Sequence, residues 1–197
     1  MRDLAAGLLL TLIAYGVLTG CSSDPSPAVT PQVVSSPLPN LLPPDWRYEK
    51  DAIQLHVEAD PLLNLFHKEP HTLLLCTYHL RDPNAFNQLQ EEKGGLQKLL
   101  DCGRFDPSVL YARRFVLQPG QTLEQALDRS DGARFIAFAA GYYKVQRAGM
   151  TASLPVPLAI VKREGAVLQI PQKMRIDLRL GPQELKEVQA TPVSQKD

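Results

Sequence analysis

The three cysteines of this 197-residue chain are the residues whose surroundings suggest chemistry most directly. Cys21 ends the tetrapeptide Leu18-Thr19-Gly20-Cys21, which resembles the lipobox read by the lipoprotein signal peptidase. In that chemistry the thiol is the nucleophile that accepts a diacylglycerol, and the two small residues before it let the peptidase reach the backbone. We therefore expect cleavage between Gly20 and Cys21 and lipidation of Cys21.

The segment before Cys21 is typical of a secretory signal peptide, which we place at residues 1–20. Its apolar run over 4–18 is shorter than the roughly 20 helical residues that a membrane span needs. Ser22 and Ser23 follow the cysteine in place of Asp, which is typical of lipoproteins sorted to the outer membrane of Gram-negative bacteria. The sequence thus predicts an acylated outer-membrane protein that faces the periplasm. An ordinary secretory signal with a chance cysteine is the alternative.

The next segment, residues 21–45, has the composition of a tether. Seven prolines and almost no charge lie between Ser22 and Pro44, so this stretch can neither bury a core nor hold a helix. The whole chain carries 21 basic and 21 acidic residues. This balance gives no electrostatic reason to expect a nucleic acid as partner.

The other two cysteines are candidates for a disulfide. Cys76 and Cys102 remain once Cys21 carries lipid, and an oxidising periplasm favours a bond between them. Such a bond would join a helical segment to the strand before it. Two unpaired cysteines, with Cys76 simply buried, are the alternative.

The histidines give no metal site. His67 and His71 have the spacing of a metal pair on a helix, but Pro70 between them indicates a loop that does not hold that geometry. His56 and His79 lie in different expected strands, and we place both on wet strand faces.

The sequence also lacks the signatures of common catalytic sites. It contains no Gly-rich phosphate loop, no G-x-S-x-G elbow and no pair of carboxylates that would bracket a pocket. We therefore expect no catalytic residues, no cofactor and no small-molecule substrate.

The elements that must position these residues follow from the apolar pattern. It predicts one β-rich domain over 46–182, followed by a polar tail over 183–197. Two short helices are expected between Asp82 and Leu100. The run over 122–127 alternates like a strand, although its composition leaves a helix open. Seven or eight strands with one helical insertion after the second strand indicate a β-sandwich. The expected strands cover 53–57, 72–80, 111–117, 122–127, 133–143, 158–162, 167–170 and 174–180.

Several ordered motifs carry a resemblance to a known family. The lipobox cysteine and the tether are followed by DPLLN (60–64), YHLRDP (78–83), LQPGQT (117–122) and DGARFIAFAAGY (131–142). This order is similar to the outer-membrane lipoproteins of the bacterial type VI secretion system, the TssJ family, over 46–180. A cysteine in the second strand and a leucine-rich first loop depart from the family pattern.

The resemblance implies a transthyretin-like β-sandwich without catalysis, held in the outer membrane by its acyl chains. It also implies binding to the periplasmic C-terminal domain of the inner-membrane protein TssM, through the loop between the first two strands. Here that loop is 60–70, and exposed apolar side chains in a loop are themselves typical of an interface. The same side chains could instead fold back onto the sandwich edge. The partner-binding residues we expect are Leu62, Leu63, Asn64, Leu65, Phe66 and His67.

A different class of function remains open on the sequence alone. A transthyretin-like lipoprotein could bind a saccharide or a peptidoglycan fragment, and such a binder should show a groove lined by aromatic side chains. An assembly subunit should instead present a convex apolar loop. Aromatic residues make up only 7% of the chain, which favours the assembly subunit.

Overall fold

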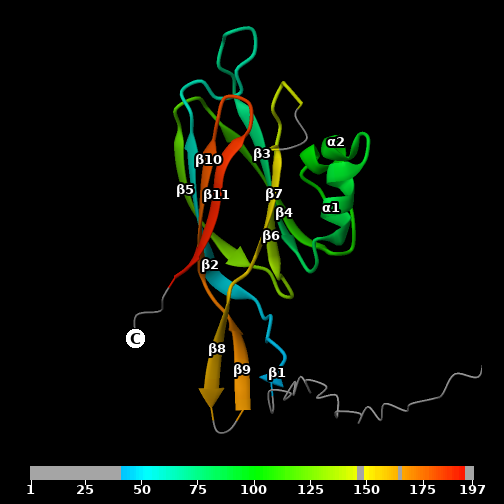
Figure 1. Ribbon diagram of the computed structural model, residues 1–197, viewed down its shortest axis with the longest axis vertical. Helices are drawn as coiled ribbons and strands as arrows, with labels where there is room; N and C mark the ends of the chain where they lie inside the picture. The colour runs from blue at the N-terminus through cyan, green and yellow to red at the C-terminus, as the bar shows by residue number, and fades with distance from the viewer. Residues whose placement is uncertain (1–40, 146–148, 164–165, 194–197) are drawn as a thin grey trace, which may run out of the picture. The chain divides into compact units, whose positions relative to one another are not determined.

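The computed structural model describes residues 41–145, 149–163 and 166–193. The expectations for the signal peptide, for Cys21 and for the tether up to residue 40 lie outside the described residues. The described part contains two four-stranded sheets, a three-stranded sheet and two short helices, so the fold is mainly β, as the sequence predicts (Figure 1). No helix in these ranges is long and apolar enough to cross a membrane.

The first sheet has the strand order β11-β10-β2-β5. On β2 the side chains of Ile53, Leu55 and Val57 are buried, because the alternation of the sequence places all three on the inner face. The strand pairs antiparallel with β5 and parallel with β10. The four strands are β2 (Glu49–Ala59), β5 (Thr122–Arg129), β10 (Met174–Leu180) and β11 (Leu185–Pro192).

The second sheet has the order β4-β3-β6-β7 and is antiparallel throughout. Nearly every side chain of β3 and β6 is buried, which agrees with their continuous apolar sequences. The inner faces of the two sheets share one hydrophobic core, so they form the expected sandwich. The strands are β3 (Leu73–Leu80), β4 (Val109–Leu117), β6 (Phe135–Ala140) and β7 (Thr151–Pro155).

The two expected helices, α1 (Asn84–Glu91) and α2 (Gly95–Leu100), lie between β3 and β4. They pack against the outer face of the second sheet and enclose a second hydrophobic cluster around Tyr78, whose hydroxyl donates a hydrogen bond to the carbonyl of Leu99. A disulfide joins Cys76 on β3 to Cys102 just after α2, with the two Cα atoms 5.1 Å apart. The helical segment is thus covalently attached to the strand it covers.

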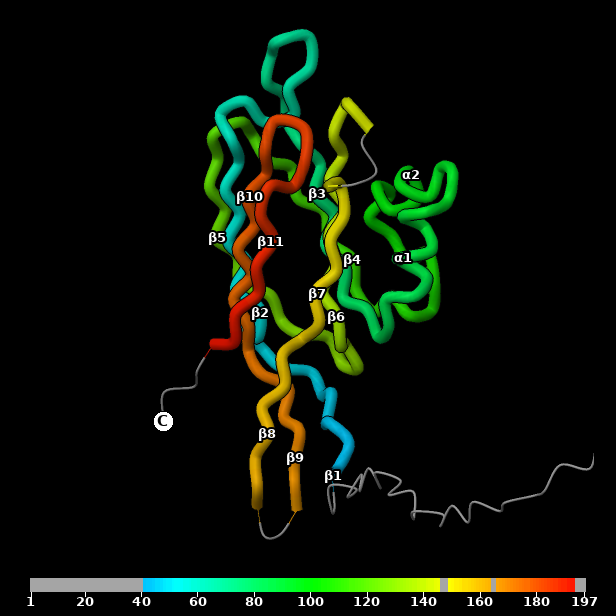
Figure 2. The backbone as a smooth tube through the Cα atoms, in the orientation of Figure 1, coloured from blue at the N-terminus to red at the C-terminus, as the bar shows by residue number. Residues whose placement is uncertain are grey.

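A third sheet extends from the sandwich (Figure 2). It has the order β1-β9-β8. In this sheet β8 and β9, which contain the expected strands 158–162 and 167–170, form an antiparallel hairpin, and β1 pairs with β9 in parallel. The strands are β1 (Leu41–Leu42), β8 (Leu158–Arg163) and β9 (Ala166–Pro171). We refer to it as the outer sheet.

Three strands differ from the expectations. Residues 41–42, expected to belong to the tether, form β1, which pairs with β9. Residues 185–192, expected to belong to a polar tail, form β11, because Leu185, Val188 and Ala190 are spaced to pack against the core between outward-facing charges. β7 carries small and polar residues that give no clear period in the sequence, and it forms because it can pair with the apolar strand β6.

Candidate functional site

The loop between β2 and β3, residues 60–72, lies at one end of the sandwich, and its base is held firmly (Figure 1). The carboxylate of Asp60 accepts a hydrogen bond from the backbone N–H of Leu62 at 2.8 Å and forms an ion pair with Lys186 at 3.2 Å. The Leu62 hydrogen bond is the main cause that lowers the pKa of Asp60 below its ordinary value, and Lys186 adds to it. The backbone N–H of Leu65 donates to the carbonyl of Pro182, which joins the loop to the β10–β11 connection.

The tip of the loop is a tight two-residue turn. The backbones of Phe66 and Glu69 exchange two hydrogen bonds, at 2.9 and 3.0 Å. Between them, His67 and Lys68 both have positive φ angles, 49° and 69°, as a type I′ hairpin turn requires. Positive φ is unfavourable for residues other than glycine, so the pairing around the turn must hold it in place.

The apolar residues of the loop divide into buried and exposed ones. Leu63 is fully buried in the core, whereas Leu62 is 50% exposed and Phe66 is 41% exposed. Leu65 is partly buried and His67 is exposed. The two alternatives considered for this loop therefore both occur, in different residues.

Asn64 is buried and joins two loops. Its φ is 50°, a left-handed conformation that asparagine tolerates well. Its side-chain amide donates to the carbonyl of Thr72 at 2.8 Å, and its side-chain carbonyl accepts from the backbone N–H of Tyr143 at 2.8 Å. Asn64 thus fixes the loop after β6 against the β2–β3 loop.

This junction brings four rings together on the surface, and we call the group of Phe66, His67, His71 and Tyr143 the aromatic patch. Phe66 stacks on Tyr143 with ring centroids 5.1 Å apart and an interplanar angle of 23°. His71 meets Tyr143 edge to face at 5.0 Å, and His67 meets Phe66 in the same manner at 4.0 Å. Tyr143 is 57% exposed, so the stack is open to a partner on one side.

Two of the six expected partner-binding residues are not accessible on the surface of the domain. Leu63 and Asn64 are buried, because the loop turns inward there to close the end of the core, and they position the patch instead of presenting a surface. Leu62, Leu65, Phe66 and His67 remain accessible in part. Tyr143 is not among the six expected residues, because its ring follows a strand and nothing local in the sequence indicates that it would meet the other loop.

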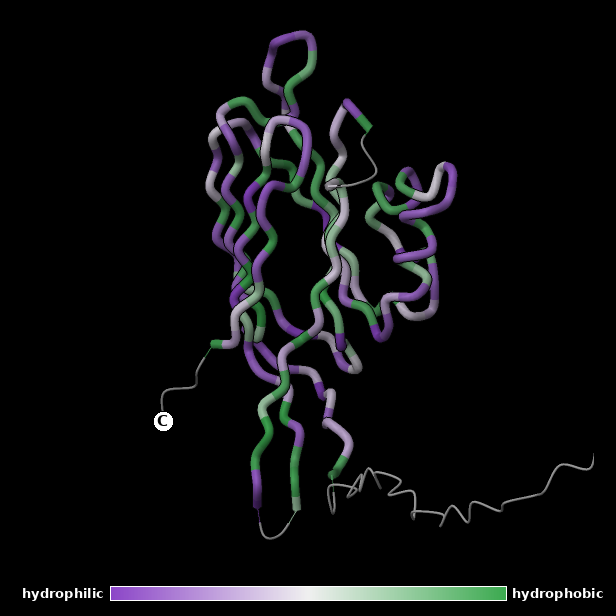
Figure 3. Tube along the Cα trace, in the orientation of Figure 1, coloured by the Kyte–Doolittle hydropathy of each residue, from purple (hydrophilic) through white to green (hydrophobic). Residues whose placement is uncertain are grey.

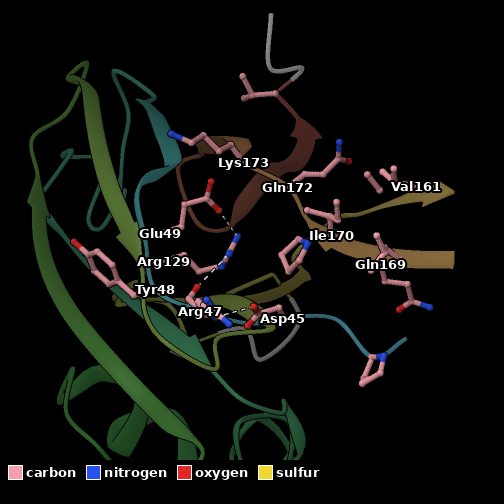
Figure 4. A pocket seen from close by; sticks show the side chains of 15 residues that line it. Asp45, Arg47, Tyr48, Glu49, Arg129, Val161, Gln169, Ile170, Gln172 and Lys173 are labelled. Atoms are coloured by element: carbon pink, nitrogen blue, oxygen red, sulfur yellow. Dashed lines mark hydrogen bonds and ion pairs between the residues drawn. The ribbon is translucent and has the colours of Figure 1, made fainter. Parts of the chain in front are cut away.

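A cavity of about 570 Å³ lies between the sandwich and the outer sheet (Figure 4). Its walls are aliphatic on the outer sheet and charged on the sandwich, where Arg129 forms an ion pair with Glu49 at 2.9 Å. Among its lining residues only Tyr48 is aromatic. The cavity is therefore not the aromatic-lined groove expected of a saccharide binder.

The histidines on the strands have different surroundings. His56 is an outward-facing residue paired with Glu124 at 2.5 Å and Glu58 at 3.2 Å, and the hydrogen bond to Glu58 is the main cause that raises its pKa. His79, expected on a wet face, is instead buried, because both faces of β3 are covered. Burial lowers the pKa of His79 to about 4. In the described ranges no group of His, Cys, Asp and Glu side chains could hold a metal ion.

A comparison with models of known families identifies one family. Residues 51–183 match the family model described as type VI secretion lipoprotein, VasD, EvfM, TssJ. Among solved structures, the lipoprotein TssJ1 from Pseudomonas aeruginosa is similar with a TM-score of 0.52 and 22% identity, over 75% of this chain and 98% of that one. A search of the curated proteins found no match.

Two further structures share the fold. Serratia marcescens Lip, a membrane-bound component of the type VI secretion system, is similar with a TM-score of 0.50 and 19% identity, over 72% of this chain and 96% of that one. A chain in a structure described as the TssM C-terminal domain from EAEC has a TM-score of 0.51 and 17% identity, over 72% of this chain and 98% of that one.

Proposed function

The chain belongs to the type VI secretion lipoprotein family, and we propose that it is a structural subunit of the secretion membrane complex. In this role it binds the periplasmic C-terminal domain of TssM and links it to the outer membrane through acyl chains on Cys21. The family is one of structural lipoproteins, and the role needs no catalysis.

The observation that carries the proposal is the aromatic patch. Large aromatic side chains that are preorganised and exposed on one side are the type of residue that dominates binding energy at protein interfaces. The patch is preorganised because Asn64 and the ion-paired Asp60 hold its two loops. A partner would therefore meet Phe66 and Tyr143 at little cost in conformational entropy.

The location of the patch supports the same partner. It lies on the loop between the first two sandwich strands, through which the family resemblance implies TssM binding. The residues at its rim are charged or polar, among them Lys68 and Glu69, as is typical of an interface rim around an apolar centre.

The direct test is binding of the cognate TssM periplasmic domain to the Phe66→Ala and Tyr143→Ala variants. Each should lose at least about tenfold in affinity, which corresponds to about 1.4 kcal/mol. Val116→Ala is the matched control, because Val116 is 58% exposed on β4, outside the patch, and its loss should leave affinity unchanged. Equal affinities for all four proteins would refute the proposed interface.

The anchor is tested separately in cells. Cys21→Ser should leave an uncleaved precursor that takes up no palmitate, because the acceptor thiol is gone. Palmitate incorporation into that variant at the wild-type level would refute acylation at Cys21, whatever the outcome of the binding experiment.

A further inference from the structure

The outer sheet carries an unusual share of exposed aliphatic side chains. Twelve large hydrophobic residues are exposed in the described part of the chain, and five of them belong to this small sheet. Ile160 is the most exposed of the five, at 70%. The tube in Figure 3 shows the hydrophobic colour along β8 and β9. The five residues are Leu41, Leu42, Leu158, Ile160 and Ile170.

These side chains occupy both faces of the sheet. The register places Leu41, Leu158, Ile160 and Val167 on one face together with Lys162 and Gln169. Leu42, Val161, Leu168 and Ile170 lie on the other face, and the last three of these line the cavity beside the sandwich. A sheet with one face in water normally alternates apolar and polar residues. The face directed away from the cavity departs from this pattern, because Leu41, Leu158, Ile160 and Val167 outnumber its polar members Lys162 and Gln169, so this face is suited to an apolar medium.

The charges where β8 ends indicate which medium covers the outer sheet. β8 ends in Lys162 and Arg163, and neither β8 nor β9 contains an acidic residue. Glu164 follows in the sequence, which still leaves an excess of one positive charge on the hairpin. Aliphatic side chains next to cationic ones are the combination that binds the anionic surface of a bilayer.

The position of β1 in the sequence, shortly after Cys21, also favours a bilayer. Cys21 precedes β1 by a tether of about 20 residues, and β1 is itself hydrogen-bonded to β9. The first residues that the structure describes, Leu41 and Leu42, therefore belong to the outer sheet. The aromatic patch lies at the opposite end of the sandwich, on the β2–β3 loop (Figure 1).

We propose that the outer sheet is a second membrane contact, which places its aliphatic side chains in the interfacial region of the bilayer that carries the acylated Cys21. This rests on the proposed anchoring of the chain. The contact would orient the domain, because a flexible tether alone leaves its direction free, whereas a sheet held on the lipid surface directs the aromatic patch away from it.

The test uses the full-length, acylated protein in vesicles of phosphatidylcholine and phosphatidylglycerol with brominated acyl chains, which quench tryptophan on contact. Trp46 is the only native tryptophan, so Trp46→Phe gives a silent background. Leu158→Trp and Ile160→Trp both report on the face directed away from the cavity. Val116→Trp on the sandwich is the matched control, and the thermal transition of each variant is checked first.

The expected result is strong quenching and a shift to shorter emission wavelength for Leu158→Trp and Ile160→Trp, with neither change for the control. If the protein floats with the vesicles and both reporters stay unquenched, the second contact is refuted and the anchor stands. If it does not float, both proposals fail. A wavelength shift without quenching by the lipid would identify a protein surface as the occupant and would also overturn this proposal.

Discussion

Phe66 and Tyr143 stack on each other with ring centroids 5.1 Å apart, although they belong to loops that follow different strands. The Asn64 side chain, which accepts a hydrogen bond from the Tyr143 backbone, keeps the two loops in register. The proposed TssM-binding surface therefore depends on a junction between loops and not on one loop alone.

The first prediction concerns this stack. In a double-mutant cycle, Phe66→Ala and Tyr143→Ala should be non-additive in their effect on TssM affinity, with a coupling free energy of about 0.5 to 1.5 kcal/mol. The physical reason is that each ring supports the other in the free protein. Calorimetric titration of the four proteins measures the coupling, and strict additivity would show that the rings act independently.

The second prediction separates two neighbouring leucines. Leu63→Ala should lower the free energy of unfolding by about 2 to 5 kcal/mol, because it opens a cavity in a filled core. Leu62→Ala should change it by no more than about 0.5 kcal/mol, because that side chain is half exposed. Urea unfolding of both variants measures the difference. Similar values for the two would contradict the inward turn of the loop at Leu63.

The third prediction concerns the Cys76–Cys102 disulfide. Reduction should lower the free energy of unfolding by about 3.5 kcal/mol, since the bond closes a loop with a sequence separation of 26 residues. The transition temperature with and without a reducing agent measures the loss. The Cys76→Ala/Cys102→Ala variant is the control, and its transition should not respond to the reductant.

The fourth prediction concerns pH. Burial lowers the pKa of His79 from 6.5 to about 4, so the unfolded chain binds a proton there more readily than the folded one. The free energy of unfolding should therefore fall as the pH decreases, by about 2 kcal/mol between pH 8 and pH 5 for this residue. Urea unfolding at several pH values above the range where Asp and Glu titrate measures the slope.

Two variants test whether His79 causes this fall in the free energy of unfolding with decreasing pH. His79→Gln should remove the loss, because no titrating group remains at the buried position. His56 acts with the opposite sign: its raised pKa gives stability that is present below pH 6.5 and disappears as the pH rises through its folded pKa. His56→Gln should therefore make the acid loss steeper. An unchanged slope in His79→Gln would place the titrating group elsewhere.

Much of the fold could be predicted from local patterns. The alternation in β2 and β10, the continuous apolar run of β3 and the helical spacing around Phe86 and Leu89 each indicate their element directly. The run over 122–127, whose composition is also compatible with a helix, forms part of β5. Its pairing with β2 outweighs a composition that also suits a helix.

The rest depended on contacts between distant residues. Nothing in LLNLF distinguishes Leu62 from Leu63, since a loop has no period that assigns a face. The position of Tyr143 beside Phe66 follows only from the pairing of β3 with β6. His79 was expected on a wet face because a polar residue in a strand usually faces water, but in β3 the second face is also covered.

The parallel pairing of β2 with β10 also limits when the domain can form. Residues that meet across these strands, such as Glu58 and Arg179, are 121 positions apart in sequence. One edge of β2 therefore stays unpaired until nearly the whole domain has been synthesised. We expect slow folding and a need for chaperone protection during that interval, because exposed strand edges promote aggregation.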